Sequence, residues 1–148
     1  MTTERAFIDT NLFLRYLTND IPEKADRVEE LLQRAGLGEI ILVTTSLVIA
    51  KIVWTLTSFY GLSRDQIRDG LRLAYGHRGL AILNTPGLEI AESDLLIEAA
   101  TNYAAKNVDF IDAYNVAWMV QQQLSTAYTF DRKHFYRFEN ITVKMPGE

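Results

Sequence analysis

The sequence contains no cysteine among its 148 residues, and it contains only two histidines, His77 and His134. Without cysteine, the chain can form neither a disulfide framework nor a thiolate zinc site. Because neither histidine has another histidine nearby in the sequence, a histidine-rich metal site is not expected. The chain also has no glycine-rich phosphate loop and no nucleophile-elbow motif, so no motif marks a nucleotide site or a serine hydrolase.

Long apolar segments and an excess of positive charge are missing as well. No apolar run approaches the length of a membrane span, and the first ten residues lack the long apolar core of a signal peptide. Together with the lack of cysteine, these absences predict a cytoplasmic protein. The formal net charge is −4, so a nucleic-acid ligand would need a local basic patch or a bridging cation.

The sequence does contain a regular alternation of strand-like and helix-like segments. Its composition, 48% hydrophobic and 23% charged, indicates one folded domain over residues 1–148. The expected strands are residues 5–8, 39–43, 80–83, 126–130 and 141–145. Helical periodicity fills the first three of the segments between them, from residue 88 onward in the third. This order predicts an α/β fold, a three-layer α/β/α sandwich with a mainly parallel sheet. A helical pair at residues 47–76 is expected to protrude from it.

Three aspartates are expected to meet at one edge of this sheet. Asp9 ends the first expected strand, Asp131 ends the strand at 126–130, and Asp112 begins the helix that leads into that strand. The carboxyl ends of parallel strands lie on one edge, where α/β folds bind ligands. Three adjacent carboxylates require a cation among them, and hard oxygen ligands favour Mg²⁺ or Mn²⁺ over zinc. Each aspartate taken alone also fits a structural role as a helix cap.

Three further residues bear on this site. Asp109 is expected to be the N-cap of the same helix as Asp112. Lys51 is the only charged residue between Ile40 and Ser63, in a segment that is apolar nearly all round. Its amine either reaches water while its stem is buried, or it pairs with the aspartates. His134 is expected to be a surface residue, and a role near the substrate is the less favoured alternative.

Four segments occur in an order and spacing that cover nearly the whole chain: FIDTNLFLRYL, SLVIAKIVWTL, VDFIDAYNVA and TFDRKHF. Together they resemble the PIN domains, and most closely the VapC-like toxins of toxin–antitoxin pairs. The resemblance implies an α/β/α sandwich with a helical clip. It also implies a metal-dependent endoribonuclease that uses Mg²⁺ or Mn²⁺, with family acids on Asp9, Asp112 and Asp131.

The same resemblance implies further roles and partners. It places near the site an auxiliary acid and three small polar residues, which are Asp109, Thr10, Asn11 and Thr129. Proteins of this family commonly pair as homodimers, and toxins of this type bind an antitoxin, so both partners are expected beside the RNA substrate. The basic residues that either contact the RNA backbone or remain solvated charges are Arg15, Arg132 and Lys133.

The chain departs from the family pattern at Lys51, where the second family acid is normally a glutamate. Four acids would carry a charge of −4, whereas three aspartates and one lysine carry −2. Opposed unit charges about 4 Å apart are worth roughly 4 kcal/mol at an effective dielectric constant of about 20, so metal binding should be weakened. Two functions follow: an endoribonuclease weakened by Lys51, or an impaired PIN-fold protein that binds RNA or an antitoxin without efficient cleavage. Phosphatases and phospho-receivers would need further signature residues after Asp9.

Overall fold

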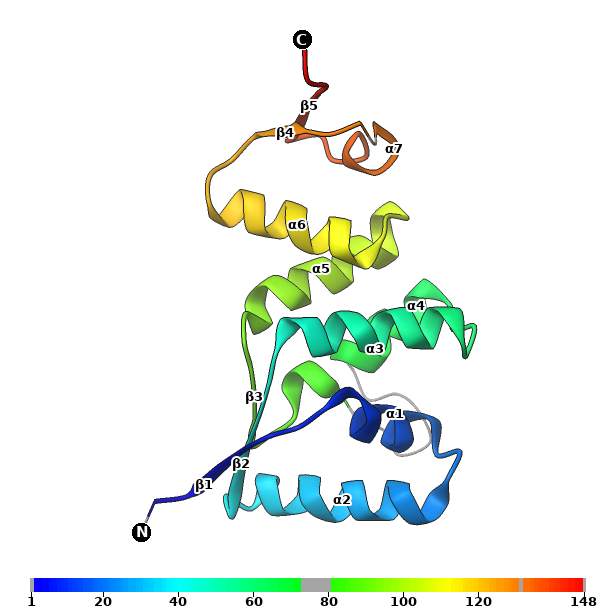
Figure 1. Ribbon diagram of the computed structural model, residues 1–148, viewed down its shortest axis with the longest axis vertical. Helices are drawn as coiled ribbons and strands as arrows, with labels where there is room; N and C mark the ends of the chain where they lie inside the picture. The colour runs from blue at the N-terminus through cyan, green and yellow to red at the C-terminus, as the bar shows by residue number, and fades with distance from the viewer. Residues whose placement is uncertain (1, 73–80, 131, 148) are drawn as a thin grey trace. The chain divides into compact units, whose positions relative to one another are not determined.

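The computed structural model describes residues 2–72, 81–130 and 132–147, in two compact units of residues 1–93 and 94–148 (Figure 1). The elements of the first unit are β1 (Glu4–Phe7), α1 (Thr10–Thr18), α2 (Pro22–Gly36), β2 (Ile40–Thr44), α3 (Ser46–Ser58), α4 (Arg64–Arg72), the 3₁₀ helix η1 (Ile82–Asn84) and β3 (Leu88–Ile90). Those of the second unit are α5 (Ser93–Lys106), α6 (Phe110–Gln121), β4 (Thr126–Tyr128), α7 (Arg132–Phe135) and β5 (Thr142–Lys144).

All strand pairs in the described residues are parallel: β1 with β2, β2 with β3, and β4 with β5. Helices flank these strands along the chain, so the predicted α/β fold with a parallel sheet is confirmed. No described helix combines the length and the apolar character needed to cross a membrane. The single domain over residues 1–148 stays a prediction.

The sheet of the first unit is built around β2, its middle strand. The β-branched sequence of β2 buries Ile40, Leu42 and Thr44 on one side. The Thr44 hydroxyl donates a buried hydrogen bond of 2.9 Å to the Ile8 carbonyl oxygen, which joins the carboxyl ends of β1 and β2. Helix α2 contacts both β2 and α1 (Figure 1). Asp9 therefore follows a strand end that a buried hydrogen bond holds in place.

Helix starts in the first unit follow the capping chemistry of the sequence. Helix α2 begins at Pro22, whose missing amide hydrogen would be unpaired in a first turn anyway. Thr45 caps α3, because its hydroxyl oxygen accepts from the Val48 amide. Before α4, Ser63 and Gln66 each use the side chain to accept from the other's amide, which is a capping box. The predicted helical pair is present as α3 and α4.

The third strand lies later in the chain than the sequence predicts. A strand is predicted at residues 80–83, but residues 82 and 83 are buried in η1, and Leu80 lies outside the described residues. Strand β3 instead occupies the segment where a helix is predicted, and that helix, α5, begins only at Ser93. The prediction is wrong because a short buried apolar run fits a helical turn as well as a strand.

Gly87 determines where β3 begins. Its φ of +79° lies in the left-handed region, and a Cβ atom here would lie 2.1 Å from the Ala35 carbonyl oxygen at the end of α2. The Gly87 carbonyl oxygen accepts a hydrogen bond of 2.9 Å from the Leu42 amide, next to the first pair of the β2–β3 ladder. Only glycine permits this close backbone approach together with this turn.

In the second unit, packing of buried side chains holds the first turn of α6 in place. The rings of Tyr103 in α5 and Phe110 in α6 meet edge to face, with centroids 6.0 Å apart. Val108 and Ala113, on either side of Phe110 in the sequence, are fully buried. Helix α6 also contacts α7. The start of α6 is therefore held by packing on both sides of the residues that carry its acidic groups.

Gly87→Ala should destabilise the protein far more than Gly38→Ala. Both glycines have a φ of +79°, but a Cβ atom at Gly38 would have no neighbour within 4 Å, whereas at Gly87 it would meet the Ala35 backbone. We expect losses in the free energy of unfolding of about 1–2 kcal/mol for Gly38→Ala and roughly 3 kcal/mol or more for Gly87→Ala. Urea denaturation measures both, and equal losses would contradict the role given to the Ala35 contact.

Candidate metal centre

Two carboxylates and one imidazole meet where α6 begins. Asp109 is the N-cap residue of α6, Asp112 lies in its first turn, and His134 lies on α7. One potential ligand atom from each of the three lies within 4.8 Å of the other two. The Nδ1 atom of His134 is 2.8 Å from Oδ2 of Asp112, and these two side chains are only 18% and 21% exposed. We call these three residues the Asp–Asp–His cluster.

The carboxylates of Asp109 and Asp9 are not used as helix caps. Both residues occupy N-cap positions, Asp109 before α6 and Asp9 before α1, but neither side chain makes a cap hydrogen bond. A purely structural role for these aspartates would be expected to show that bond. Both side chains are exposed, so the carboxylates remain accessible to a ligand at the two helix starts.

The donor set of the Asp–Asp–His cluster fits a divalent cation. Two carboxylates this close repel each other, and the N-terminus of α6 offsets only part of that repulsion. Carboxylate oxygens suit Mg²⁺ and Mn²⁺, and an imidazole nitrogen is also a common ligand of transition metals. Within the described ranges, this is the only group of three or more such side chains whose ligand atoms gather so closely.

The comparisons with known proteins identify the family. The PIN domain family model matches residues 6–141, which is nearly the whole chain. The chain belongs to the PIN domain family. Members of this family are generally nucleases that use divalent metal ions. A search of curated proteins finds no match to the chain.

The predicted metal ligands of this PIN domain lie in both units. Asp112 is in the second unit within the Asp–Asp–His cluster, and Asp109, predicted as an auxiliary acid, is directly beside it. Asp9 belongs to the first unit, where its carboxylate makes no hydrogen bond or ion pair with the other described residues of that unit. Asp131 lies outside the described residues. The convergence of Asp9, Asp112 and Asp131 therefore stays a prediction.

The small polar residues have different surroundings. Thr10 is 1% exposed, and its Oγ1 atom has no hydrogen-bond partner among the described residues. Leaving a buried hydroxyl unpaired costs about 1–3 kcal/mol, so the Thr10 hydroxyl, directly after Asp9, lowers the stability of the fold. Asn11 is exposed on α1. Thr129 follows β4, and its amide donates to the Lys144 carbonyl oxygen at 3.0 Å.

Lys51 is exposed on α3. Its ammonium group makes no ion pair with the described residues of the first unit, Asp9 included. The exposure of Lys51 does not show a buried stem, so its interpretation as a side chain with a buried stem and an amine in water stays a prediction. The alternative pairing of Lys51 with Asp112 or Asp131 stays a prediction.

The basic residues predicted to face RNA are described only in part. Arg15 is half-buried and forms an ion pair of 2.7 Å with Asp20. Lys133 is exposed on α7, and the side chain of Arg132 lies outside the described residues. Their contacts with RNA remain predictions.

The sequence alone does not reveal the contact of His134 with Asp112. This residue was expected at the surface, but its side chain is half-buried and hydrogen-bonded to Asp112. No second histidine lies near His134 in the sequence, but a single histidine can join carboxylates in a metal site. No local spacing signals this contact, because Asp112 lies 22 residues earlier on a separate helix.

Asp112→Asn should weaken divalent-metal binding strongly. The substitution removes a negative charge and a strong oxygen ligand from the cluster, so we expect the affinity for Mn²⁺ to fall at least about tenfold. Asp94→Asn is a matched control, because Asp94 is also an acid in the first turn of a helix of the same unit but lies outside the cluster. Titration with Mn²⁺ followed by electron paramagnetic resonance measures both. Equal affinities for the two variants would contradict this assignment.

Thr10→Val replaces the buried hydroxyl with a methyl group of the same shape. Because Oγ1 of Thr10 has no described partner, we expect stability to be kept or to rise by up to about 1–2 kcal/mol. Thermal and urea unfolding measure this change. A clear loss of stability would show that the hydroxyl has a hydrogen-bond partner in solution.

Proposed function

We propose that this PIN domain is a VapC-like, metal-dependent endoribonuclease that cleaves phosphodiester bonds in RNA. The observation that carries the proposal is the Asp–Asp–His cluster, in which metal-ligating groups gather within 4.8 Å at the start of α6. The cluster lies inside the segment that matches a family of nucleases. Fold and chemistry therefore support the same class of reaction.

In this proposal, Asp9, Asp112 and Asp131 are the catalytic carboxylates and hold one or two Mg²⁺ or Mn²⁺ ions. A bound divalent ion would supply a water of lowered pKa and would stabilise charge on the phosphoryl oxygens. The protein's own residues perform the positioning. Asp109 adds negative charge beside Asp112, and His134 holds one oxygen of the Asp112 carboxylate through its Nδ1 atom.

Several partners belong to the proposal. The substrate is RNA, with Arg15, Arg132 and Lys133 as backbone contacts, and Thr10, Asn11 and Thr129 lie near the site. An antitoxin and a second copy of the chain are the proposed protein partners, in the cytoplasm. Large exposed apolar side chains support a protein-binding surface on α3, where the rings of Trp54 and Phe59, 59% and 72% exposed, meet edge to face.

Lys51 favours a second candidate, a PIN domain that binds RNA or an antitoxin without efficient cleavage. A lysine stands in the helix that normally supplies the second family acid, and its ammonium group is exposed. A positive charge near the carboxylates would compete with the metal ion. The two candidates differ only in how strongly the charge of Lys51 weakens the binding of the metal ion.

Lys51→Glu should increase cleavage of a structured RNA in the presence of Mn²⁺. The substitution replaces a repulsive charge with a metal ligand, so we expect cleavage at least about tenfold faster and tighter Mn²⁺ binding. Lys51→Gln, which removes the charge but supplies no carboxylate, should be intermediate.

The double variant Lys51→Glu with Asp112→Asn is the control for contaminating nucleases and should not cleave. Equal, strong activity of the natural chain and Lys51→Glu would show that Lys51 does not weaken the site. A lack of cleavage by both, despite bound Mn²⁺, would contradict the endoribonuclease and favour the binding protein.

A further inference from the structure

A short connection between α5 and α6, residues 107–109, places the first acid of the Asp–Asp–His cluster. Asn107 has a φ of +54°, in the left-handed region that commonly ends a helix, and Val108 is fully buried. Asp109 is exposed, and its carboxylate makes no hydrogen bond with the described residues. The position of this carboxylate therefore depends on the backbone that precedes it.

The side chain of Arg137 holds this backbone in place. Its Nη1 atom donates hydrogen bonds to the carbonyl oxygen of Lys106, at 3.4 Å, and to the carbonyl oxygen of Asn107. Both carbonyls lie at the end of α5, where carbonyl groups lack partners within the helix and the helix dipole is negative. A cation is favourable there, and a guanidinium has enough donors to serve two neighbouring carbonyls at once.

The main chain of Arg137 is attached to the other side of the cluster. Its amide donates to the carbonyl oxygen of His134 at 3.1 Å, in the turn that follows α7. Helix α7 has only four residues, and a helix of this length is not stable alone, so contacts with the rest of the unit must hold it. Phe138, directly after Arg137, is 5% exposed and anchors the same turn in the core.

Arg137 thus joins the two segments that carry the cluster. On one side it binds the carbonyl oxygen two residues before Asp109, and on the other it binds the carbonyl oxygen of His134. The 2.8 Å hydrogen bond between His134 and Asp112 is a separate link, and it restrains only those two side chains. The contacts of Arg137 supply the restraint that the side chain of Asp109 lacks.

We propose that Arg137 is a positioning residue of the metal centre. It holds the segment before α6 to the turn after α7, and so keeps the Asp109 carboxylate within reach of an ion bound by Asp112 and His134. Residues that orient metal ligands raise metal affinity by about 10–100-fold in other proteins. The proposal rests on the metal-binding part of the proposed function, and it does not require that the bound ion cleaves RNA.

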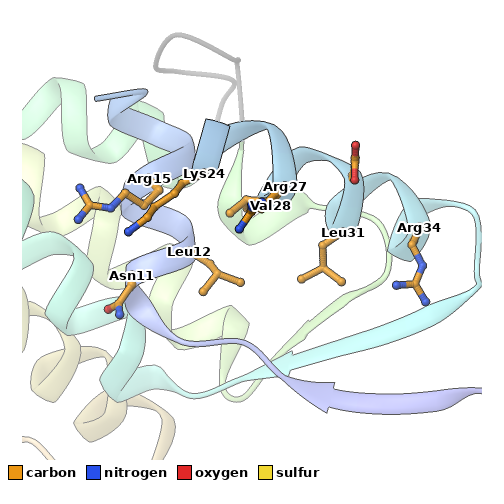
Figure 2. Close-up of a pocket in the computed structure, with 9 residues that line it drawn as sticks. Asn11, Leu12, Arg15, Lys24, Arg27, Val28, Leu31 and Arg34 are labelled. Carbon is orange, nitrogen blue, oxygen red and sulfur yellow. The ribbon is translucent and has the colours of Figure 1, made fainter. Parts of the chain in front are cut away.

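Arginines of the first unit are used differently. Arg15 pairs with Asp20 at 2.7 Å, and Arg34, in the last turn of α2, pairs with Glu39 at 3.4 Å. Figure 2 shows these two arginines at opposite ends of a hollow along α1 and α2. Arg137 makes no ion pair with a carboxylate of the described residues. Its hydrogen bonds act on the path of the main chain instead.

Two other roles would leave metal affinity unchanged. If Arg137 only stabilises the end of α5, its loss would lower the melting temperature and nothing else. If it contacts a phosphate of RNA, its loss would weaken RNA binding. The affinity for Mn²⁺ in the absence of RNA therefore separates positioning from both of these roles.

The test is a titration of the full chain with Mn²⁺, followed by electron paramagnetic resonance. We expect Arg137→Gln to weaken Mn²⁺ binding about fivefold to tenfold, because Arg137 acts on the main chain beside a ligand rather than on the ligand itself. Loss of a positive charge alone would strengthen the binding of a cation, so charge does not explain a weaker affinity. Arg137→Lys keeps the charge without the planar donors, and should weaken binding about twofold to threefold.

Arg34→Gln is the matched control. It removes the same group from the end of another helix, but Arg34 is paired with Glu39 and lies in the first unit. We expect it to change Mn²⁺ affinity less than about twofold. Equal losses of affinity in Arg34→Gln and Arg137→Gln would overturn the proposal.

A double-mutant cycle shows whether Arg137 acts through Asp109. Asp109→Asn removes the carboxylate that Arg137 is proposed to hold, and asparagine is also a favoured N-cap residue. In this background, Arg137→Gln should change Mn²⁺ affinity less than about twofold. A full effect of Arg137→Gln in this background would overturn the proposal.

Circular dichroism first establishes that each variant is folded. If Arg137→Gln is unfolded, Arg137→Lys takes its place in the cycle. A folded variant at Arg137 that binds Mn²⁺ as tightly as the natural chain would overturn only the role of Arg137. Failure of the natural chain to bind Mn²⁺ would overturn the metal centre and this proposal with it.

Discussion

The candidate site depends on how the negative charge of Asp109 and Asp112 is balanced at the start of α6. The N-terminus of α6 carries a partial positive charge, and His134 makes a hydrogen bond to Asp112, but two carboxylates remain within 4.8 Å of the same imidazole. A divalent cation would balance the rest. The packing of Phe110 and Val108 keeps the helix start, and with it this concentration of charge, in place.

Local sequence signals predicted most of the fold. Pro22, Thr45 and Ser63 stand at helix starts, where chemistry that acts over a few residues sets the boundary. The third strand was misplaced because its position depends on Gly87 packing against the backbone of Ala35, more than fifty residues earlier in the chain. A tertiary contact of this kind leaves no periodic pattern in the sequence.

The sequence predicts those groups of the candidate site whose position depends on neighbouring residues in the chain. Asp109 and Asp112 were found because acids at a helix start stand out, whereas His134 was missed because its hydrogen bond joins two separate helices.

The central claim is that Asp9 and Asp112 hold a divalent ion together in a nuclease site. A crystal structure of the full chain soaked with Mn²⁺, with an anomalous difference map, tests this claim most directly. The account predicts an anomalous peak bonded to the Asp112 carboxylate, with the Asp9 carboxylate as a further ligand of the same ion. A map without a peak at Asp112, or with Asp9 far from that peak, would contradict the account.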